Sequence, residues 1–202
     1  MNRPMLRYAV VIPSVGRESL RQLLEDLATQ PGPGPEEVVV VDDRPVGVPP
    51  LQLADHEGLR VRVVAGCGRG PAAARNLGWQ VTRAPWVAFL DDDVRLPPGW
   101  STALVADLAS LGPRDAASQG RIKVPLPTDR RPTDWERATA GLESAHWATA
   151  DMAYRREALQ QVHGFDERFP RAYREDADLA LRVRRAGWRL QQGRRHVLHP
   201  PR

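Results

Sequence analysis

Short apolar runs alternate along the first half of the chain with segments whose apolar residues recur at helical spacing. The apolar runs predict buried strands at residues 8–13, 37–41, 59–64 and 86–90. The helical spacing predicts helices at residues 17–29 and 71–82, and Pro71 suits the first turn of the second helix. Strands that alternate with helices, and that are nearly continuous in valine and isoleucine, predict an α/β fold with a mostly parallel central sheet flanked by helices.

The second half of the chain shows weaker periodicity. Helices are predicted at residues 100–110, 155–162 and 176–185, and strands near 119–124 and 149–154. Residues 113–146 are rich in proline, arginine and aspartate, so we expect a long and partly mobile loop at about 125–137. No internal repeat and no second domain are apparent, and residues 1–202 are therefore expected to form one domain.

Aspartates directly follow two of the predicted strands, at Asp42–Asp43 and Asp91–Asp93. Ligands of parallel α/β sheets bind beyond the carboxyl ends of the strands, so both groups are expected to line one crevice. If Asp91–Asp93 continues the extended strand, Asp91 and Asp93 share a face and Asp92 points away. Such a pair offers oxygen ligands for Mg²⁺ or Mn²⁺, although the alternative is a solvated turn, where aspartate is common.

The composition of the chain argues against several classes of protein. The 202 residues are 42% apolar and 27% charged, with a formal net charge of +4. Basic residues are mixed with acids along the chain, which argues against a nucleic-acid-binding stripe. Cys67 is the only cysteine, and no apolar run approaches the length of a transmembrane segment. We therefore expect a cytoplasmic protein, and we leave open a peripheral position at a membrane reached through a partner.

Seven motifs follow one another in a specific order from about residue 8 to residue 199. They read YAVVIPSVGR, EVVVVDD, GPAAARNLGW, VAFLDDDV, MAYRREAL, GFDERF and EDADLALRVRRAGW. This ordered set resembles the family 2 glycosyltransferases of the GT-A fold, which is Rossmann-like. The resemblance implies a nucleotide-diphospho-sugar donor, a divalent metal (Mn²⁺ or Mg²⁺) and transfer with inversion at the anomeric carbon. It also implies a nucleotide-sugar-binding half at about 1–98 and an acceptor-binding half with the catalytic base at about 99–202.

The resemblance assigns donor and metal roles by position. Asp91 and Asp93 match the Asp-x-Asp motif of the family, with Asp93 as the direct metal ligand. In some relatives a histidine after the last helix also ligates the metal, and His199 fits that distance better than His196. The alternative for both histidines is a structural or solvated side chain, or a disordered one, as is common near a chain terminus. The positions matched to nucleotide-sugar binding are Pro13, Ser14, Arg17, Asp42, Asp43, Arg75, Asp91 and Asp92.

A second carboxylate cluster opens the predicted helix at residues 176–185. Acids in a first turn suit the helix dipole, so capping alone explains them. Sugar transfer, however, needs a general base for the acceptor hydroxyl in addition to a metal that stabilises the leaving diphosphate. The family's Glu-Asp motif implies that Asp176 is this base and that Glu175 assists it or binds the acceptor. Asp178 is interpreted as part of the helix surface or as a partner of those two acids.

Further residues are matched to the acceptor and to the diphosphate. Trp147 and Asp151 fall in the part of the family that meets the acceptor, although a large aromatic residue such as Trp147 is often simply core. Arg155 and Arg156 match a basic pair, one member of which is expected to contact diphosphate. Asn76 is either part of the donor site with Arg75 or a local backbone cap.

The chain departs from the family pattern at Ser14–Arg17, at Val94 and in the ATAD stretch before MAYRR. These positions lie near the nucleotide and acceptor subsites, so a UDP-, GDP- or dTDP-sugar donor and a glycan, lipid-linked or small-molecule acceptor all stay open. Two alternative functions are a sugar-nucleotide-forming nucleotidyltransferase and a non-catalytic module that binds a nucleotide-sugar or a glycan. A nucleotidyltransferase usually has a glycine-rich loop with lysine or arginine directly after the first strand, and SVGRES is a poor version of that loop. A binding module has no need of a base.

Overall fold

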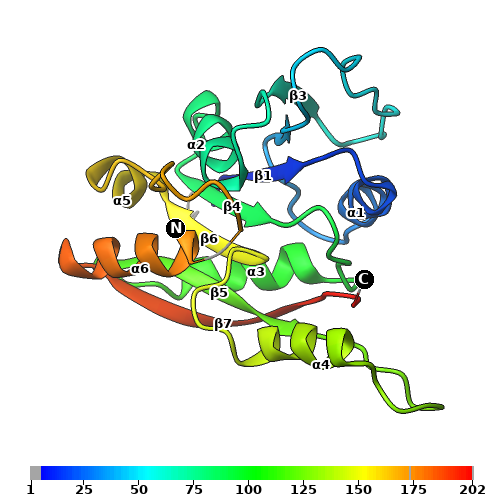
Figure 1. The fold of residues 1–202 in the computed structure, drawn as a ribbon. Helices are drawn as coiled ribbons and strands as arrows, with labels where there is room; N and C mark the ends of the chain where they lie inside the picture. The colour runs from blue at the N-terminus through cyan, green and yellow to red at the C-terminus, as the bar shows by residue number, and fades with distance from the viewer. Residues whose placement is uncertain (1–5, 173, 202) are drawn as a thin grey trace.

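The computed structural model describes residues 6–172 and 174–201, whose strands form one seven-stranded sheet in the order β3-β2-β1-β4-β6-β5-β7 (Figure 1). Every strand and helix predicted for the first half is confirmed, with ends that move by no more than two residues. These elements are β1 (Tyr8–Ser14), α1 (Glu18–Ala28), β2 (Val38–Asp42), β3 (Val61–Ala65), α2 (Pro71–Val81) and β4 (Trp86–Leu90).

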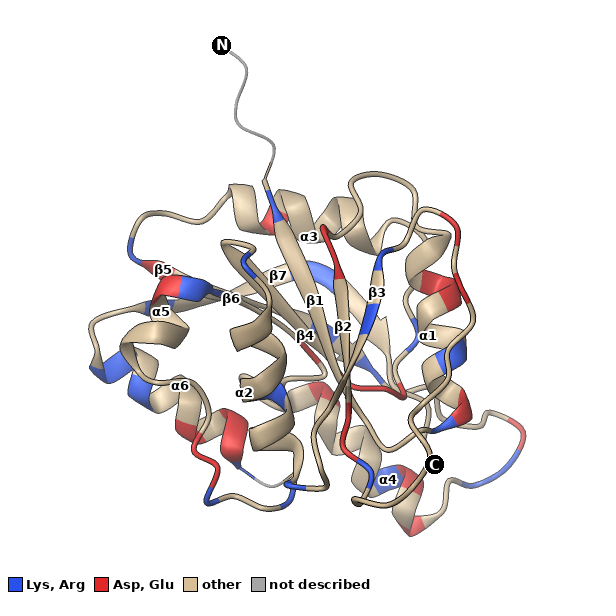
Figure 2. Ribbon diagram, turned by 90° about the horizontal axis from the view of Figure 1, so that it is seen from above, with Lys and Arg blue, Asp and Glu red and all other residues tan. Residues whose placement is uncertain are grey.

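The pairing of strands confirms a mostly parallel sheet. β1 pairs in parallel with β2 and β4, and β2 pairs in parallel with β3. In the second half, β6 (Asp151–Arg155) runs antiparallel to both β4 and β5 (Asp115–Lys123), and β7 (Arg189–Leu198) is parallel to β5. The carboxyl ends of β1, β2 and β4 therefore lie at one edge of the sheet, and the acidic segments after β2 and β4 lie at this same edge (Figure 2).

Helices cover both faces of the sheet. α1 and α3 (Trp100–Ala109) pack on one face, and α2, α5 (Arg156–Gln161) and α6 (Glu175–Arg185) pack on the other (Figure 1). Val10 and Ile12 of β1 face the first layer, whereas Val11 between them faces the second. Because both faces are covered, the central strands read as continuous apolar runs. None of the helices in the described ranges is long and apolar enough to cross a bilayer.

The expected loop at about 125–137 is only partly correct. A short helix, α4 (Asp134–Ala140), begins inside it and continues into the 3₁₀ turn η1 (Gly141–Ser144). Thr133 and Glu136 form a capping box, in which each side chain bonds the backbone N–H of the other residue. The Thr-x-x-Glu spacing was visible in the sequence and marks this start. β5 also begins earlier than predicted, at Asp115.

The strand β7 was not predicted. Its ten residues, RLQQGRRHVL, carry few apolar side chains, so the pattern does not resemble a buried strand. Pairing with β5 nevertheless buries alternate positions near its end, at Gly193, Arg195 and Val197. β7 thereby brings the end of the described chain back across the sheet to the segment that follows β4.

Candidate active site

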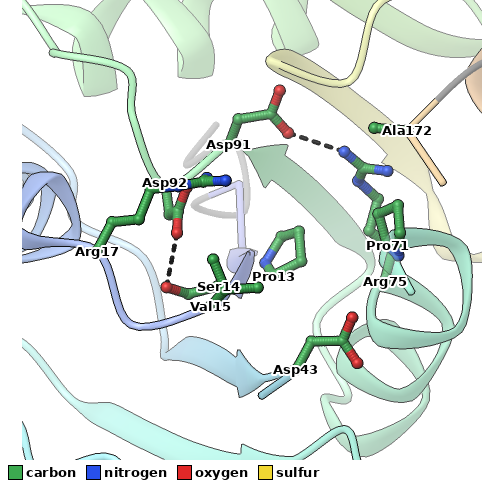
Figure 3. Close-up of a pocket in the computed structure, with 10 residues that line it drawn as sticks. All are labelled: Pro13, Ser14, Val15, Arg17, Asp43, Pro71, Arg75, Asp91, Asp92 and Ala172. Carbon is green, nitrogen blue, oxygen red and sulfur yellow. Dashed lines mark hydrogen bonds and ion pairs between the residues drawn. The ribbon is translucent and has the colours of Figure 1, made fainter. Parts of the chain in front are cut away.

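A pocket of about 220 Å³ opens at the carboxyl edge of the sheet (Figure 3). Its walls come from the ends of β1 and β4, the loop after β2 and the first turns of α2. Most of the residues assigned from the sequence to nucleotide-sugar binding line it, and Val15, Pro71 and Ala172 are additional. The lining residues are Pro13, Ser14, Val15, Arg17, Asp43, Pro71, Arg75, Asp91, Asp92 and Ala172.

The three aspartates after β4 lie in a turn, because the strand ends at Leu90. The expectation that they extend the strand is wrong, but their side chains still separate. Asp92 is 2% exposed and accepts hydrogen bonds from the Ser14 hydroxyl at 2.7 Å and from Arg17 Nη1 at 2.6 Å. The Asp92 side chain therefore connects the turn after β1 with the turn after β4. Asp91 and Asp93, in contrast, lie near His199.

Asp91, Asp93 and His199 form a candidate metal site. Each offers one ligand atom, and these atoms lie within 4.8 Å of one another. His199 Nε2 lies 3.5 Å from Asp93 Oδ1, and the other ring nitrogen, Nδ1, is buried without a hydrogen bond to any described residue. Carboxylates and an imidazole suit Mn²⁺, whereas Mg²⁺ favours oxygen ligands alone. The residues present thus fit a divalent cation.

Backbone pairing places His199 beside the aspartates. The His199 N–H donates to the Lys123 carbonyl at 2.8 Å. Leu198 and Arg95 exchange two backbone hydrogen bonds of 2.9 and 2.8 Å, which tie the end of β7 to the segment just after Asp93. The position of His199 therefore depends on β7, while His196 does not belong to the cluster of potential ligands.

Arg75 connects the two carboxylate clusters. Its side chain is 3% exposed and projects from α2 toward the pocket. Its Nη2 donates to Asp91 Oδ1 at 2.8 Å, and its Nη1 donates to Glu175 Oε1 at 2.9 Å. Glu175 is the first residue of α6 and is also buried. This ion-pair chain holds the start of α6 against the turn that carries the candidate metal ligands.

Asp176 lies next to this chain, and its side chain is partly exposed. One oxygen accepts a hydrogen bond of 2.7 Å from the Ala177 N–H. Burial raises the pKa of Asp176 above its ordinary value and the charge of Asp91 adds to this, while the Ala177 N–H and Arg75 oppose it. A carboxylate with a raised pKa is a better proton acceptor than an ordinary aspartate. Asp178 instead pairs with Arg182 at 2.8 Å along the helix, as a surface residue would.

The two aspartates after β2 have different environments. Asp42 is bound by the Arg44 guanidinium through two hydrogen bonds of 2.7 Å, which hold the pKa of its carboxyl below the usual value. Asp43 lines the pocket and accepts hydrogen bonds of 2.9 Å from the N–H groups of Arg69 and Gly70. Of the two, Asp43 therefore has the position of a ligand-facing group.

Asp151 does not have the environment expected of an acceptor-binding residue. Its side chain is fully buried, with one oxygen bound by Arg195 Nε at 2.8 Å and the other by Trp100 Nε1 at 3.0 Å. Both oxygens are thus used inside the fold, and no surface is left for an acceptor. Trp147 is partly exposed and lines a different groove, between α6 and β7.

The basic pair does not reach the pocket, so the expectation that one member contacts diphosphate is wrong. Arg155 donates to the Asp115 carbonyl at 2.8 Å and stacks on Trp86. Arg156 donates to two further backbone carbonyls, those of residues 79 and 84, each at 2.9 Å. Both guanidiniums donate hydrogen bonds to carbonyl groups at the edge of the sheet that lies away from the pocket.

Asn76 has a structural role. Its amide donates to the Phe165 carbonyl at 2.9 Å and to Glu167 at 3.0 Å, and its oxygen accepts from the Phe165 N–H at 2.8 Å. It therefore holds the GFDERF turn, which precedes α6, against α2. The sequence left this residue open between donor binding and a local role, and the contacts favour the latter.

Comparison with known proteins identifies relatives of this chain. The chain is 29% identical over 170 residues to the pre-mycofactocin glycosyltransferase of Mycobacterium tuberculosis, an alignment that covers 76% of this chain and 35% of that protein. A shorter stretch of 63 residues is 43% identical to the succinoglycan biosynthesis protein ExoO of Rhizobium meliloti, covering 31% of this chain and 18% of that protein. The chain thus spans about a third, or less, of the length of these relatives.

Solved structures share the fold. The mannosyltransferase PcManGT from Pyrobaculum calidifontis, in complex with GDP-Man and Mn²⁺, superposes with a TM-score of 0.65 at 20% identity, covering 95% of this chain and 56% of that one. Residues 1–349 of S. aureus TarS, in complex with UDP-GlcNAc, give 0.63 at 18% identity, with coverages of 96% and 56%. The expected GT-A fold is therefore confirmed. The family model described as glycosyl transferase family 2 matches residues 9–181, which is most of the sequence, and the chain belongs to that family.

Proposed function

We propose that this chain is the catalytic domain of an inverting, metal-assisted glycosyltransferase that moves a sugar from a nucleotide-diphospho-sugar to an acceptor hydroxyl. The observation that carries this proposal is the link through Arg75 between two carboxylates, Asp91 of the candidate metal site and Glu175 beside Asp176. One group has the chemistry for the leaving diphosphate and the other for the acceptor proton. The bound GDP-Man and UDP-GlcNAc of the two structural neighbours support a nucleotide-sugar donor.

Apart from His199, which follows β7, the donor half of the site comes from about residues 1–98. The pocket between β1, β2 and α2, which Pro13, Ser14 and Asp43 line, would hold the nucleoside. Asp91, Asp93 and His199 would hold a divalent cation, Mn²⁺ or Mg²⁺, which as a Lewis acid stabilises charge on the leaving diphosphate. Arg17, which also lines the pocket, adds a positive charge near the donor while it orients Asp92.

The base comes from about residues 99–202. Asp176 accepts the proton of the acceptor hydroxyl while the hydroxyl oxygen bonds to the anomeric carbon. The bond between that carbon and the diphosphate oxygen breaks on the opposite face, and the nucleoside diphosphate leaves with the electron pair. Displacement from the opposite face inverts the anomeric configuration. Glu175 is held by Arg75, so its role is to position the first turn of α6 and Asp176 with it.

Calorimetry with UDP, GDP and dTDP, with and without Mn²⁺, tests the donor part of this proposal. We expect one nucleotide to bind in a Mn²⁺-dependent manner. Asp93→Asn should abolish the Mn²⁺ dependence, whereas Asp129→Asn, at an exposed site away from the pocket, should keep it. A folded protein that binds none of the three nucleotides contradicts the proposal.

A further inference from the structure

A second concave surface lies on the outer side of α6, and its volume is about 660 Å³. It is bounded by α6, by the turn into β7 and by Trp147 from the segment before β6. We call it the α6–β7 groove. It combines indole rings, an exposed leucine and arginines, and its principal residues are Trp147, Leu181, Arg184, Arg185, Trp188 and Arg189.

The outward face of α6 accounts for the unusual composition of this groove. Leu179 and Val183 of the helix are buried against the sheet. Leu181, Arg184 and Arg185 follow the spacing i, i+3 and i+4, so their side chains share the opposite face. Leu181 is 44% exposed, which places an apolar side chain in solvent among guanidinium groups. Because a helix face that contacts only water usually carries polar side chains, an exposed leucine among arginines indicates a binding surface.

The positive charge of the groove is not neutralised within the fold. In the described ranges, neither Arg184 nor Arg185 has an ion-pair partner, in contrast to Arg182, which pairs with Asp178. Arg189, in contrast, lies 3.2 Å from Asp115. α6 carries its acids in the first turn and its arginines in the last (Figure 2). The groove includes Arg184 and Arg185 and therefore lies at the basic end of the helix.

We propose that the α6–β7 groove binds an anionic saccharide. The flat faces of Trp147 and Trp188 suit contact with sugar rings, because an indole offers a large apolar surface. The guanidinium groups of Arg184 and Arg185 suit carboxylate or other acidic substituents, which they can bind through paired hydrogen bonds. A concave surface fits a chain of sugar residues better than it fits a bilayer, which calls for apolar side chains that protrude.

The position of the groove makes its ligand part of the acceptor, an inference that rests on the proposed function. Leu181 follows Asp176 by five residues, which is about 7.5 Å along the helix axis. Ala177, next to Asp176, lies one turn before Leu181 on the same outward face. A saccharide seated in the groove can therefore continue along α6 toward the base. The acceptor class inferred for this chain is an acidic glycan.

Titration of the full chain with tetragalacturonate, without nucleotide or metal, tests the groove directly. Tetragalacturonate is expected to bind, and the neutral maltotetraose is not. Arg184→Gln combined with Arg185→Gln should weaken binding by about tenfold, since it removes two exposed charge contacts that each contribute a few-fold in affinity. The matched control is Arg60→Gln combined with Arg83→Gln, which removes the same charge at exposed sites outside the groove. Equal binding of the two tetrasaccharides, or unchanged binding by the groove variant, overturns the proposal.

A second pair of variants, at Leu181, separates the effect of an added negative charge from the effect of a lost apolar contact. Leu181→Gln and Leu181→Glu both remove the apolar side chain at an exposed position, and only the latter adds a negative charge. Leu181→Glu should weaken tetragalacturonate binding more than Leu181→Gln does. Equal effects of the two contradict an anionic ligand.

Three further outcomes separate this proposal from a membrane contact and from the proposed transferase function. If vesicles that contain phosphatidylglycerol bind the chain through Arg184 and Arg185 while tetragalacturonate does not, the groove is a membrane contact and the saccharide assignment is wrong. If Mn²⁺-dependent nucleotide binding is intact and tetragalacturonate does not bind, only the groove proposal fails. If tetragalacturonate binds and no nucleotide does, the saccharide site stands and the proposed transferase function fails.

Discussion

Replacing Arg195 of β7 with methionine is expected to destabilise the fold by about 3–5 kcal/mol, the usual cost of removing one partner from a buried ion pair. The Arg195 side chain has no exposed surface. Its guanidinium donates to Asp151 at 2.8 Å, to Asp107 at 3.0 Å and to the Ser118 hydroxyl at 2.9 Å. Methionine fills a similar space, but it leaves two buried carboxylates without a cation.

The loss of stability should depend on pH in a defined direction. Burial raises the pKa of Asp151, and Arg195 opposes this rise. Without Arg195 the pKa of Asp151 rises further in the folded state, so the folded variant holds a proton that the unfolded chain releases. Stability of the variant then increases as pH falls toward that pKa. The difference from the unmodified protein should therefore be larger at about pH 8 than at about pH 5.5.

Urea unfolding at the two pH values measures the difference in free energy, and thermal unfolding should show a midpoint lower by roughly 6–20 °C at the higher pH. Arg194→Met is the matched control, because Arg194 is the exposed neighbour in the same strand. A loss of less than about 1 kcal/mol, or a loss that is equal at both pH values, refutes the argument that the buried charges drive the effect.

Four further predictions concern the proposed site. Asp176→Asn should keep Mn²⁺-dependent nucleotide binding and lower the transfer rate by about 10²–10⁴-fold; transfer at the unmodified rate would mean that another group is the base. Because burial raises the pKa of Asp176, the acidic limb of the kcat/KM profile should lie above the range of an ordinary aspartate, with activity lost as pH falls; a limb at or below about pH 4 contradicts this. His199→Gln should weaken Mn²⁺ binding by about tenfold or more while His196→Gln leaves it unchanged, and calorimetry that shows equal effects would exclude His199 as a ligand. Arg75→Met should lower the free energy of unfolding by about 3 kcal/mol, because buried Glu175 loses its ion-pair partner, and a variant as stable as the unmodified protein argues against that link.

The amino-acid sequence by itself determined the βαβ framework of the first half. The strands around Val10, Val39 and Phe89 are buried on both faces, so their apolar runs are unbroken, and the helices between them have a clear buried stripe. These signals are local, and each element can be recognised without knowledge of its neighbours. The acids after β2 and β4 could be assigned to one crevice for a similar reason, since parallel strands place their carboxyl ends at the same edge.

Only the tertiary structure decided which polar residues face the pocket and which support the fold. Asp151 was matched from the sequence to the acceptor, but it forms an ion pair with Arg195 inside the core. Arg75 meets Glu175 across 100 positions of the chain, a contact that no local pattern encodes. β7 is a strand because β5 offers it hydrogen-bonding partners, not because its own residues are apolar. For charged side chains, burial depends on partners that are distant in sequence, and this is why the pairing of Arg75 with Glu175 emerged only from the folded chain. His199 could be singled out through the family resemblance, but the backbone contacts that place it beside Asp93 became visible only in the folded chain.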